Sequence, residues 1–323
     1  MTQDSGGVLL EMRGIDKVFP GVQALKNVDF TLRRGQIHAL LGENGAGKST
    51  LIKVLTGVYA KDGGTIRMDG GNIAPTSPRN AESYGISTVY QEINLIPHLS
   101  VMENICLGRE NRAAGVIRWG KVRERAREAL QRLDLKVRIA IDLPLSQCSV
   151  AIQQMVAIAR ALDVDAKMLI LDEPTSSLDE AESGELFRIM RNLRRQGMGI
   201  IFVTHFLQQV YRVSDTITVL RNGELVGEYP ASDLPRLELV AKMVGKNVEE
   251  VKELEKRAGG GEAAAARKTV VSSRRLARSG SVRPIDFDMH EGEVLGLAGL
   301  LGSGRTEIAN LLFGVDAADS GEI

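Results

Sequence analysis

Gly42-Glu43-Asn44-Gly45-Ala46-Gly47-Lys48-Ser49-Thr50 is the stretch that decides the fold of this chain. It fits the P-loop pattern G-x-x-x-x-G-K-[ST], in which backbone N–H groups surround phosphate groups. Residues 36–41 before it form an apolar run typical of a buried parallel strand. Residues 51–55 after it have the apolar spacing of a helix, which a chance glycine-rich turn would not require. The order of strand, glycine loop and helix therefore predicts a nucleotide site.

A second pattern supplies the acidic groups that such a site needs. Lys48 is expected to reach the β- and γ-phosphates, and the Ser49 hydroxyl to bind Mg²⁺. Asp172 and Glu173 follow the apolar run 167–171, and successive strand residues point to opposite faces. Asp172 is expected to face the Mg²⁺, and Glu173 to polarise a water for attack on the γ-phosphate. The alternative is a strand edge with two solvated acids.

Four further side chains are candidates for this site, each with an ordinary structural alternative. His205 ends the buried run 200–204, where α/β folds place ligands, and is either a contact of the γ-phosphate or attacking water or a structural histidine. Gln91 ends another expected strand and is either a contact of the metal or water or a surface residue. Phe19 either stacks on a nucleotide base or packs within its strand. Ser149 is expected to cap a helix, and helix N-termini attract anions.

Composition narrows the classes of protein. The chain has 323 residues, which favours one large domain plus additional material. Its 41 basic and 41 acidic residues give no basic field that would indicate a nucleic-acid partner. Cys106 and Cys148 lack metal-binding spacing and are typical of a reduced cytosolic compartment. Neither a signal peptide nor a membrane-spanning apolar run is recognised, so we expect a soluble chain that is able to dock on a membrane protein.

The beginning of the chain is repeated near its end. Val28-Asp29-Phe30 returns as Ile285-Asp286-Phe287, Gly42 returns as Gly299, and the spacing between the copies is constant. Such a duplication indicates two copies of one domain. In the second loop Arg305 replaces the lysine, and the two side chains are not interchangeable at a site built for a compact ammonium.

These patterns predict three segments. A first domain spans residues 8–245 and includes a helical subdomain at about 98–165. A charged, glycine- and alanine-rich linker spans 246–281. An incomplete second copy begins at 282 and is interrupted at Ile323, before any acidic strand of its own.

Together these motifs make the chain resemble the ATP-binding subunit of an ABC transporter, and most closely the tandem-domain importers of ribose, galactose and xylose type. The resemblance covers residues 8–245 and 282–323. It implies an α/β P-loop NTPase fold, the ABC-type nucleotide-binding domain, with an antiparallel β subdomain and a helical subdomain, followed by a partial second copy. The motifs that carry it are Phe19-Pro20-Gly21-Val22-Gln23-Ala24-Leu25, the P-loop, Tyr90-Gln91-Glu92-Ile93-Asn94-Leu95-Ile96-Pro97, Leu171-Asp172-Glu173-Pro174-Thr175-Ser176-Ser177-Leu178-Asp179 and the second Gly-Arg-Thr loop.

The resemblance also implies a role for each matching residue. Phe19 matches the adenine-stacking aromatic residue, Gln91 the glutamine that senses the γ-phosphate and Mg²⁺, and His205 the switch histidine. Residues 42–50 match the Walker A loop. The remaining matches are the Walker B aspartate at Asp172, the catalytic glutamate at Glu173 and the D-loop aspartate at Asp179.

The family signature L-S-G-G-Q falls on Cys148-Ser149-Val150-Ala151-Ile152, where only the serine is kept. In the family, ATP lies between the Walker motifs of one domain and the signature of another. The natural partner signature for the Lys48 site would lie beyond Ile323. Hydrolysis is therefore expected to require another polypeptide or pairing of two copies through the altered signature.

The resulting hypothesis is ATP-driven import of a sugar or similar solute, with ATP and Mg²⁺ as cofactors. Its expected partners are membrane permease subunits, a second ATPase domain or subunit and, indirectly, a solute-binding protein outside the membrane. The expected location is the cytoplasmic face of the cell membrane, with permease contact through the segment from Gln91 to Val101. Two alternatives stay open: a non-transport ATPase of the same superfamily, and a truncated product that binds nucleotide without hydrolysing it.

Overall fold

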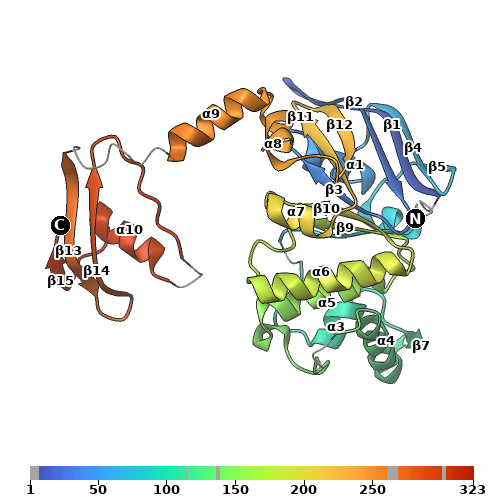
Figure 1. Ribbon diagram of the computed structural model, residues 1–323. Coiled ribbons are helices and arrows are strands. Elements are labelled where there is room, and N and C mark those ends of the chain that lie inside the picture. The colour runs from blue at the N-terminus through green and yellow to red at the C-terminus, as the bar shows by residue number, and fades with distance from the viewer. Residues whose placement is uncertain (1–6, 93, 114, 136–138, 260–267, 300–302) are drawn as a thin grey trace. The chain divides into compact units, whose positions relative to one another are not determined.

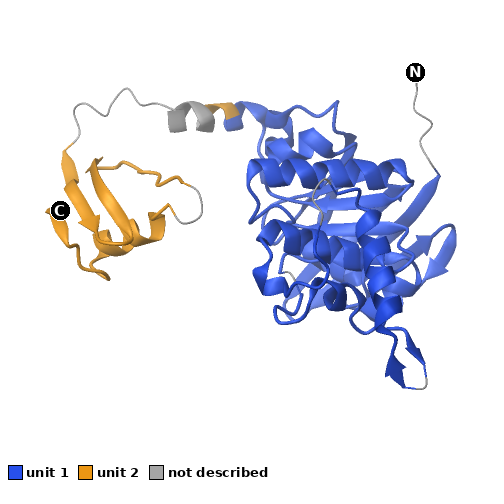
Figure 2. Cartoon of the chain, turned by 90° about the horizontal axis from the view of Figure 1, so that it is seen from below, with its two compact units in different colours: residues 1–251 blue, residues 252–323 orange. Residues whose placement is uncertain are grey.

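The computed structural model describes residues 7–323 except 93, 114, 136–138, 260–267 and 300–302, and residues 254–259 by backbone alone (Figure 1). The chain divides into two compact units, residues 1–251 and 252–323, which Figure 2 shows in different colours. No helix in the described ranges has the length and apolar character needed to cross a membrane.

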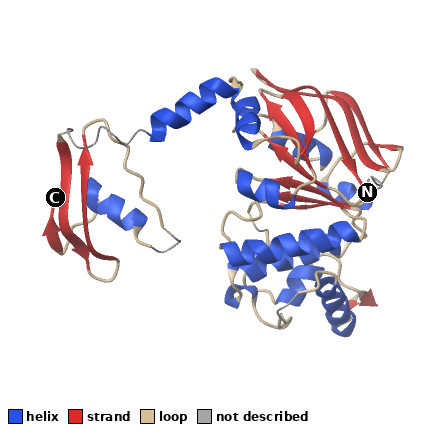
Figure 3. Cartoon of the chain, viewed as in Figure 1, coloured by secondary structure: helices blue, strands red, loops and turns tan. Residues whose placement is uncertain are grey.

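A six-stranded sheet with the order β12-β11-β3-β10-β9-β6 forms the centre of the first unit (Figure 3). Its first five strands in the chain are parallel, and β12 pairs antiparallel to β11. Because both faces of the sheet are covered, the inner strands are continuous apolar runs rather than alternating ones. The strands are β3 (Ile37–Leu41), β6 (Ile86–Val89), β9 (Met168–Asp172), β10 (Gly199–Val203), β11 (Thr216–Arg221) and β12 (Glu224–Pro230).

A second, antiparallel sheet has the order β2-β1-β4-β5 and confirms the predicted antiparallel β subdomain. Along β2, Val28, Phe30 and Leu32 are buried while the residues between them are partly exposed. This period of two places one face of the sheet on the core. The strands are β1 (Val8–Phe19), β2 (Val22–Arg33), β4 (Gly63–Met68) and β5 (Gly71–Ile73).

Two hydrophobic clusters cover opposite faces of the central sheet, and alternate strand residues enter each. Along β9, Met168 and Ile170 belong to the cluster that contains α1 (Lys48–Leu55) and the antiparallel sheet. Leu169 and Leu171 belong to the cluster that contains α5 (Val150–Leu162) and α6 (Glu180–Arg195). The remaining helices around this unit are α2 (Pro78–Ser83), α7 (Leu207–Val213) and α8 (Arg236–Val244).

The predicted helical subdomain is present within residues 98–165. Its amphipathic helix is α4 (Trp119–Gln131). Its apolar side chains Ala126 and Leu130 are buried, as the helical spacing predicts. The other elements of this layer are α3 (Val101–Cys106), the short hairpin β7 (Arg112–Ala113) and β8 (Val116–Ile117), the 3₁₀ turn η1 (Leu145–Gln147) and α5.

The second unit repeats the antiparallel part of the first, because β14-β13-β15 has the same order and directions as β2-β1-β4. The linker expected at 246–281 is more ordered than its composition indicates. A helix with two glutamates in its first turn and a strand that buries Leu276 both lie in that range, while 260–267 is outside the described residues. The elements are α9 (Val248–Gly259), β13 (Thr269–Arg278), β14 (Val282–His290), α10 (Arg305–Phe313) and β15 (Ser320–Glu322).

His38 is a fully buried polar side chain in the middle of β3. Its Nε2 lies 2.7 Å from Thr218 Oγ1, and its ring packs against Phe30 with ring centroids 4.7 Å apart. Burial lowers the pKa of His38 to about 3, because desolvation disfavours the charged imidazolium. The folded state therefore keeps this ring neutral, whereas the unfolded chain protonates it below pH ~6.5.

This difference predicts acid destabilisation that begins below pH ~6.5 and grows by about 1.4 kcal/mol per pH unit, because only the unfolded state takes up the proton. Urea unfolding between pH ~7.5 and ~5 measures this slope. His38→Gln is expected to flatten the slope by roughly this amount, whereas the same change at exposed His98 leaves it intact. Equal slopes for the parent chain and His38→Gln would contradict the assignment.

Candidate functional site

Three neighbouring strands end at one level and bring their following residues together. In the parallel register, Val203 of β10 pairs with Leu40 of β3 on one side and with Asp172 of β9 on the other. The P-loop follows β3, the acidic pair closes β9, and His205 follows β10. The carboxyl end of the sheet thus joins the three strongest predictions of the sequence, at the edge where α/β sheets bind ligands.

The P-loop requires glycine at two of its positions for steric reasons. Gly42 has φ 151°, and a Cβ there would lie 2.3 Å from the carbonyl oxygen of Leu220. Gly47 has φ 102°, and a Cβ there would lie 2.9 Å from the carbonyl oxygen of Ala24. Only glycine allows the backbone to approach this closely and to turn this way. The loop therefore leads directly into the first turn of α1, where backbone N–H groups favour an anion.

The turn between β11 and β12 packs against the P-loop and is hydrogen-bonded to it. Asn222 and Gly223 both have positive φ, 53° and 78°, as a tight two-residue hairpin turn requires. The Gly223 N–H donates to Ala46 O at 3.2 Å, and its carbonyl accepts the Lys26 N–H at 2.7 Å. The sequence predicts this hairpin but not its role, because the contact joins segments far apart in the chain.

Lys48 lies over the P-loop and shares its surroundings with two carboxylates. Its Nζ donates to Gly42 O at 2.7 Å and to Glu43 O at 2.9 Å. Burial lowers the pKa of Lys48, while the negative charges of Glu173 and Asp172 raise it. The predicted phosphate-binding cation and the acidic pair therefore interact electrostatically at one site.

Asp172 faces α1, as alternation along β9 requires, since Met168 and Ile170 lie on the same side. Burial and the charge of Glu173 raise its pKa, and Lys48 and Lys53 lower it. Lys53, in the second turn of α1, matches no motif of the sequence and is recognised only in the structure.

This donor set fits a divalent cation such as Mg²⁺. Mg²⁺ takes few protein oxygens and keeps phosphate and water ligands. Asp172 and the exposed Ser49 offer a carboxylate and a hydroxyl. Burial, and after it the charge of Glu173, raises the pKa of Asp172, and a bound cation would favour its ionised form. Among the described residues no group of three or more His, Cys, Asp or Glu side chains could hold a metal by itself.

Glu173 departs from the sequence prediction of two strand residues on opposite faces. The strand ends at Asp172, and Glu173 has φ 47°, in the left-handed region that non-glycine residues rarely adopt. Its N–H donates to Val203 O at 2.9 Å, which holds this turn against β10. Such a conformation costs about 1–3 kcal/mol and is found mainly at functional sites.

His205 lies beside Glu173, as its position after β10 predicts. Its Nδ1 is 3.3 Å from Glu173 Oε1, and its side chain is 59% exposed. The ring also packs against Phe206, with ring centroids 4.0 Å apart. Phe206 carries no signal in the sequence, because an aromatic residue at a helix start matches no known motif.

The structure places the other candidates differently. Ser149 caps α5 as predicted, and its Oγ accepts the Ile152 N–H at 3.3 Å. Gln91 is exposed two residues beyond β6, while the neighbouring residue 93 of its predicted motif lies outside the described residues. Within the described residues no hydrogen bond or ion pair joins Gln91 or Ser149 to Lys48, Asp172 or Glu173, so their roles stay predictions.

Phe19 packs within its own unit, which was the alternative to base stacking. Its ring and that of Tyr59 form a T-shaped contact with centroids 5.1 Å apart. Lys17 Nζ lies 5.3 Å from the centroid of the Phe19 ring. The ring is only partly buried, so base stacking stays a prediction. In the second unit Gly304 has positive φ at the start of α10, as Gly47 has before α1, and residues 300–302 of that loop lie outside the described residues.

Comparison with known proteins agrees with this geometry. Residues 25–176 match the family model "ABC transporter". The chain is 50% identical over 321 residues to the galactofuranose transporter ATP-binding protein YtfR of Escherichia coli K12, covering 99% of this chain and 63% of that protein. It is 49% identical over 315 residues to the ribose import ATP-binding protein RbsA 1 of Rubrobacter xylanophilus, covering 98% and 61%. The chain thus spans less than two thirds of the length of these relatives.

Solved structures share the fold. The structure of cbiO1 from Clostridium perfringens, part of the ABC transporter complex cbiONQ, superposes with a TM-score of 0.62 at 26% identity, covering 77% of this chain and 99% of that one. The predicted P-loop NTPase fold of ABC type, with its antiparallel and helical subdomains, is therefore confirmed.

Replacing Lys48 with alanine is expected to weaken binding of a fluorescent ATP analogue on the order of 100-fold, since a charged hydrogen bond to phosphate contributes about 1.5–3 kcal/mol. Fluorescence titration in the presence of Mg²⁺ measures the affinity. Lys121→Ala on exposed α4 removes the same charge elsewhere and is the matched control. Unchanged affinity of Lys48→Ala would overturn the assignment of the phosphate site.

Proposed function

The chain has the fold of an ABC transporter ATPase, and from this premise we propose that it binds and hydrolyses ATP to drive import of a sugar or similar small solute. The observation that carries the proposal is the convergence of Lys48, Asp172, Glu173 and His205 at the carboxyl end of one sheet. The two relatives are named as ATP-binding proteins of galactofuranose transport and of ribose import, which supports a sugar as the transported solute.

Each residue of the site has a distinct part in phosphoryl transfer. Lys48 and the N–H groups at the start of α1 bind the β- and γ-phosphates and offset their charge. Mg²⁺, when bound by Ser49 and Asp172, with Gln91 as the predicted further contact, neutralises charge that develops on the phosphates. Glu173 accepts a hydrogen bond from the attacking water and orients it. His205, adjacent to Glu173, donates a hydrogen bond to the γ-phosphate.

Hydrolysis also requires a partner surface. We place the altered signature Cys148–Ile152 opposite the phosphates of another ATPase domain, where the Ser149 hydroxyl and the start of α5 face the γ-phosphate. The Walker residues of this chain in turn require the signature of a second ATPase domain or subunit. The duplicated antiparallel unit at 269–322 supports a tandem arrangement of two such domains.

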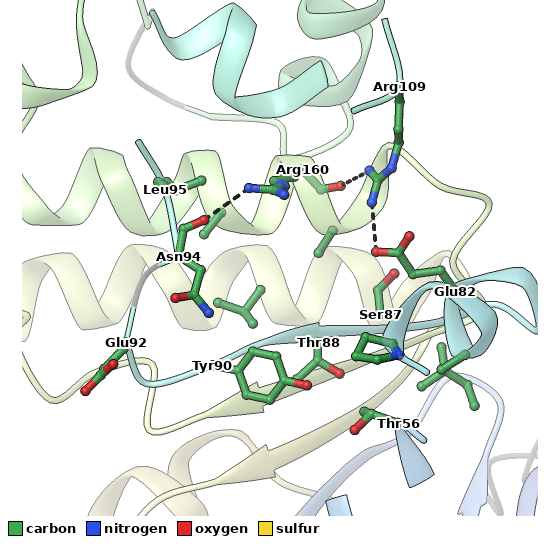
Figure 4. A pocket seen from close by; sticks show the side chains of 16 residues that line it. Thr56, Glu82, Ser87, Thr88, Tyr90, Glu92, Asn94, Leu95, Arg109 and Arg160 are labelled. Atoms are coloured by element: carbon green, nitrogen blue, oxygen red, sulfur yellow. Dashed lines mark hydrogen bonds and ion pairs between the residues drawn. The ribbon is translucent and has the colours of Figure 1, made fainter. Parts of the chain in front are cut away.

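The permease is proposed to contact a cavity beside the segment that follows Gln91. A cavity of about 200 Å³ lies between β6, α2 and α5 (Figure 4). Arg160 lines it and donates to Asn94 O at 3.1 Å, while Arg109 pairs with Glu82 at 2.8 Å. Burial and the nearby charge of Arg109 lower the pKa of Arg160.

Among the described residues Arg160 forms no ion pair with a carboxylate. A half-buried guanidinium in this state favours an acidic group from a partner. We assign that group to a cytoplasmic loop of the permease subunits. With this contact we propose that the chain lies at the cytoplasmic face of the membrane and that the solute-binding protein acts indirectly through the permease.

Glu173→Gln is expected to lower the ATP hydrolysis rate of the assembled transporter by about 100-fold or more, because the amide orients water poorly. Binding of ATP is expected to stay within a few-fold, since Glu173 contacts water rather than phosphate. Phosphate release and nucleotide titration measure the two quantities. Glu180→Gln changes a 94% exposed carboxylate on α6 and is the matched control.

The same assay separates the alternatives. Nucleotide binding without turnover that does not respond to added permease would support an inert nucleotide-binding fragment. Turnover stimulated by ribosomes or DNA, and not by permease, would support a non-transport ATPase.

Arg160→Glu is expected to reduce solute uptake into vesicles that contain the permease by at least ~10-fold, because reversal of the charge repels the proposed acidic partner. The nucleotide affinity of the isolated chain is expected to stay unchanged. Arg127→Glu, on an exposed position of α4, is the control for charge reversal. Equal uptake for Arg160→Glu and Arg127→Glu would contradict this docking site.

A further inference from the structure

Phe206 breaks two local rules of protein structure at the edge of the site. It occupies the N-cap of α7 and provides no side-chain hydrogen bond to the helix. Ser, Thr, Asp or Asn at an N-cap stabilise a helix by about 1 kcal/mol relative to residues that cannot bond. Its apolar ring is also 41% exposed. Positions that violate local preferences in this way are expected at functional sites.

The ring of Phe206 contacts the imidazole of His205. The ring centroids are 4.0 Å apart, and the planes are inclined by 41°. Since the His205 side chain is 59% exposed, few other groups restrict it, and its Nδ1 lies 3.3 Å from Glu173 Oε1. The imidazole is thus held between an aromatic ring and a carboxylate.

Buried hydroxyl groups fix the backbone that carries Phe206. Its N–H donates to the Oγ1 of Thr204 at 3.1 Å, and Thr204 is 3% exposed. Its carbonyl accepts the Gln209 N–H at 3.0 Å. Gln209 Oε1 in turn accepts the hydroxyl of Thr175 at 2.6 Å, in the segment that follows Glu173. These hydrogen bonds connect the segment that carries His205 to the segment that carries Glu173. They therefore restrict the backbone around Phe206.

We propose that Phe206 is a positioning residue for His205. The phenyl ring holds the imidazole in the rotamer that directs Nδ1 to Glu173 and leaves Nε2 for the γ-phosphate or the attacking water. Without the ring, an exposed imidazole samples several side-chain rotamers. Orientation of reacting groups contributes strongly to catalysis, so the exposed aromatic ring serves activity rather than stability. The role in hydrolysis rests on the proposed function, whereas the contact itself does not.

Histidine NMR tests the positioning directly. The chain has four histidines, so His205→Gln assigns the ring signals of His205 by their loss. Phe206→Leu is expected to shift those signals by removing the ring current, and Phe206→Tyr to retain their positions approximately. Phe313→Leu makes the same substitution at a 90% exposed site in the second unit and should leave them unmoved. If the His205 signals do not move in Phe206→Leu, the proposal is overturned. That result is also the one expected if Phe206 serves only to contact a partner.

Stability and turnover then separate positioning from a structural role. Phe206→Asn supplies an N-cap side chain, so its unfolding midpoint should equal or exceed that of the parent chain. Its kcat for ATP should fall about 10-fold with KM within two-fold, as expected when only orientation is lost. Phe206→Tyr should restore most of kcat. A fall in the unfolding midpoint with unchanged kcat would overturn the proposal.

A double variant checks that Phe206 acts through His205. In a His205→Gln background, Phe206→Leu should have no further effect on kcat, since there is no imidazole to orient. A further ~10-fold loss in that background would show an independent role and would overturn the proposal. If the assembled transporter shows no hydrolysis at all, the proposed function fails, and the NMR shifts still decide whether Phe206 positions His205.

Discussion

The shared parallel register of β3, β10 and β9 is the constraint on which the site depends. It sets Leu40, Val203 and Asp172 side by side, so the three following loops start from one edge. A slip of one residue along β9 would turn Asp172 from α1 toward α6, because strand side chains alternate between faces. The same slip would move Leu169 and Leu171 out of the α5–α6 core. Packing of the apolar residues therefore fixes the position of the Asp172 carboxylate, for which we propose a role in binding the nucleotide.

Partial burial gives the site its electrostatic character. Burial lowers the pKa of Lys48 and raises that of Asp172, so each charged form is disfavoured alone. The opposite charge of the neighbouring group partly stabilises the charged form of each side chain. At the lower effective dielectric of a partly buried site, such charges act more strongly on a bound phosphate than exposed ones do. The site is also constrained sterically. The P-loop glycines and Glu173 have positive φ angles, a backbone conformation that most residues avoid.

The sequence predicted the features that depend on local patterns. The apolar runs of β3, β9 and β10 and the cap at Ser149 all follow from neighbouring residues, and the structure confirms them. The sequence missed contacts between distant segments, such as the hydrogen bond from Gly223 to Ala46. It also missed the packing of His205 on its neighbour Phe206, because no motif marks that pair. The prediction of a linker at 246–281 rests on composition alone. Composition does not reveal that β13, within this range, pairs with β14 through backbone hydrogen bonds.

The two copies share their strand order and directions but differ in the side chains at matching positions. The spacing of the two copies aligns Tyr59 with Asp316. In the first unit Tyr59 contacts Phe19, the last residue of β1. In the second unit Asp316 forms an ion pair with Arg278, the last residue of β13, at 2.5 Å. By the same spacing Phe19 aligns with the buried Leu276, so Arg278 lies two residues beyond the position of Phe19. The second unit therefore keeps the order and directions of the strands but has a different pair of side chains at this end, two opposite charges in place of two aromatic rings. Only the aromatic pair offers an apolar face to a nucleotide base.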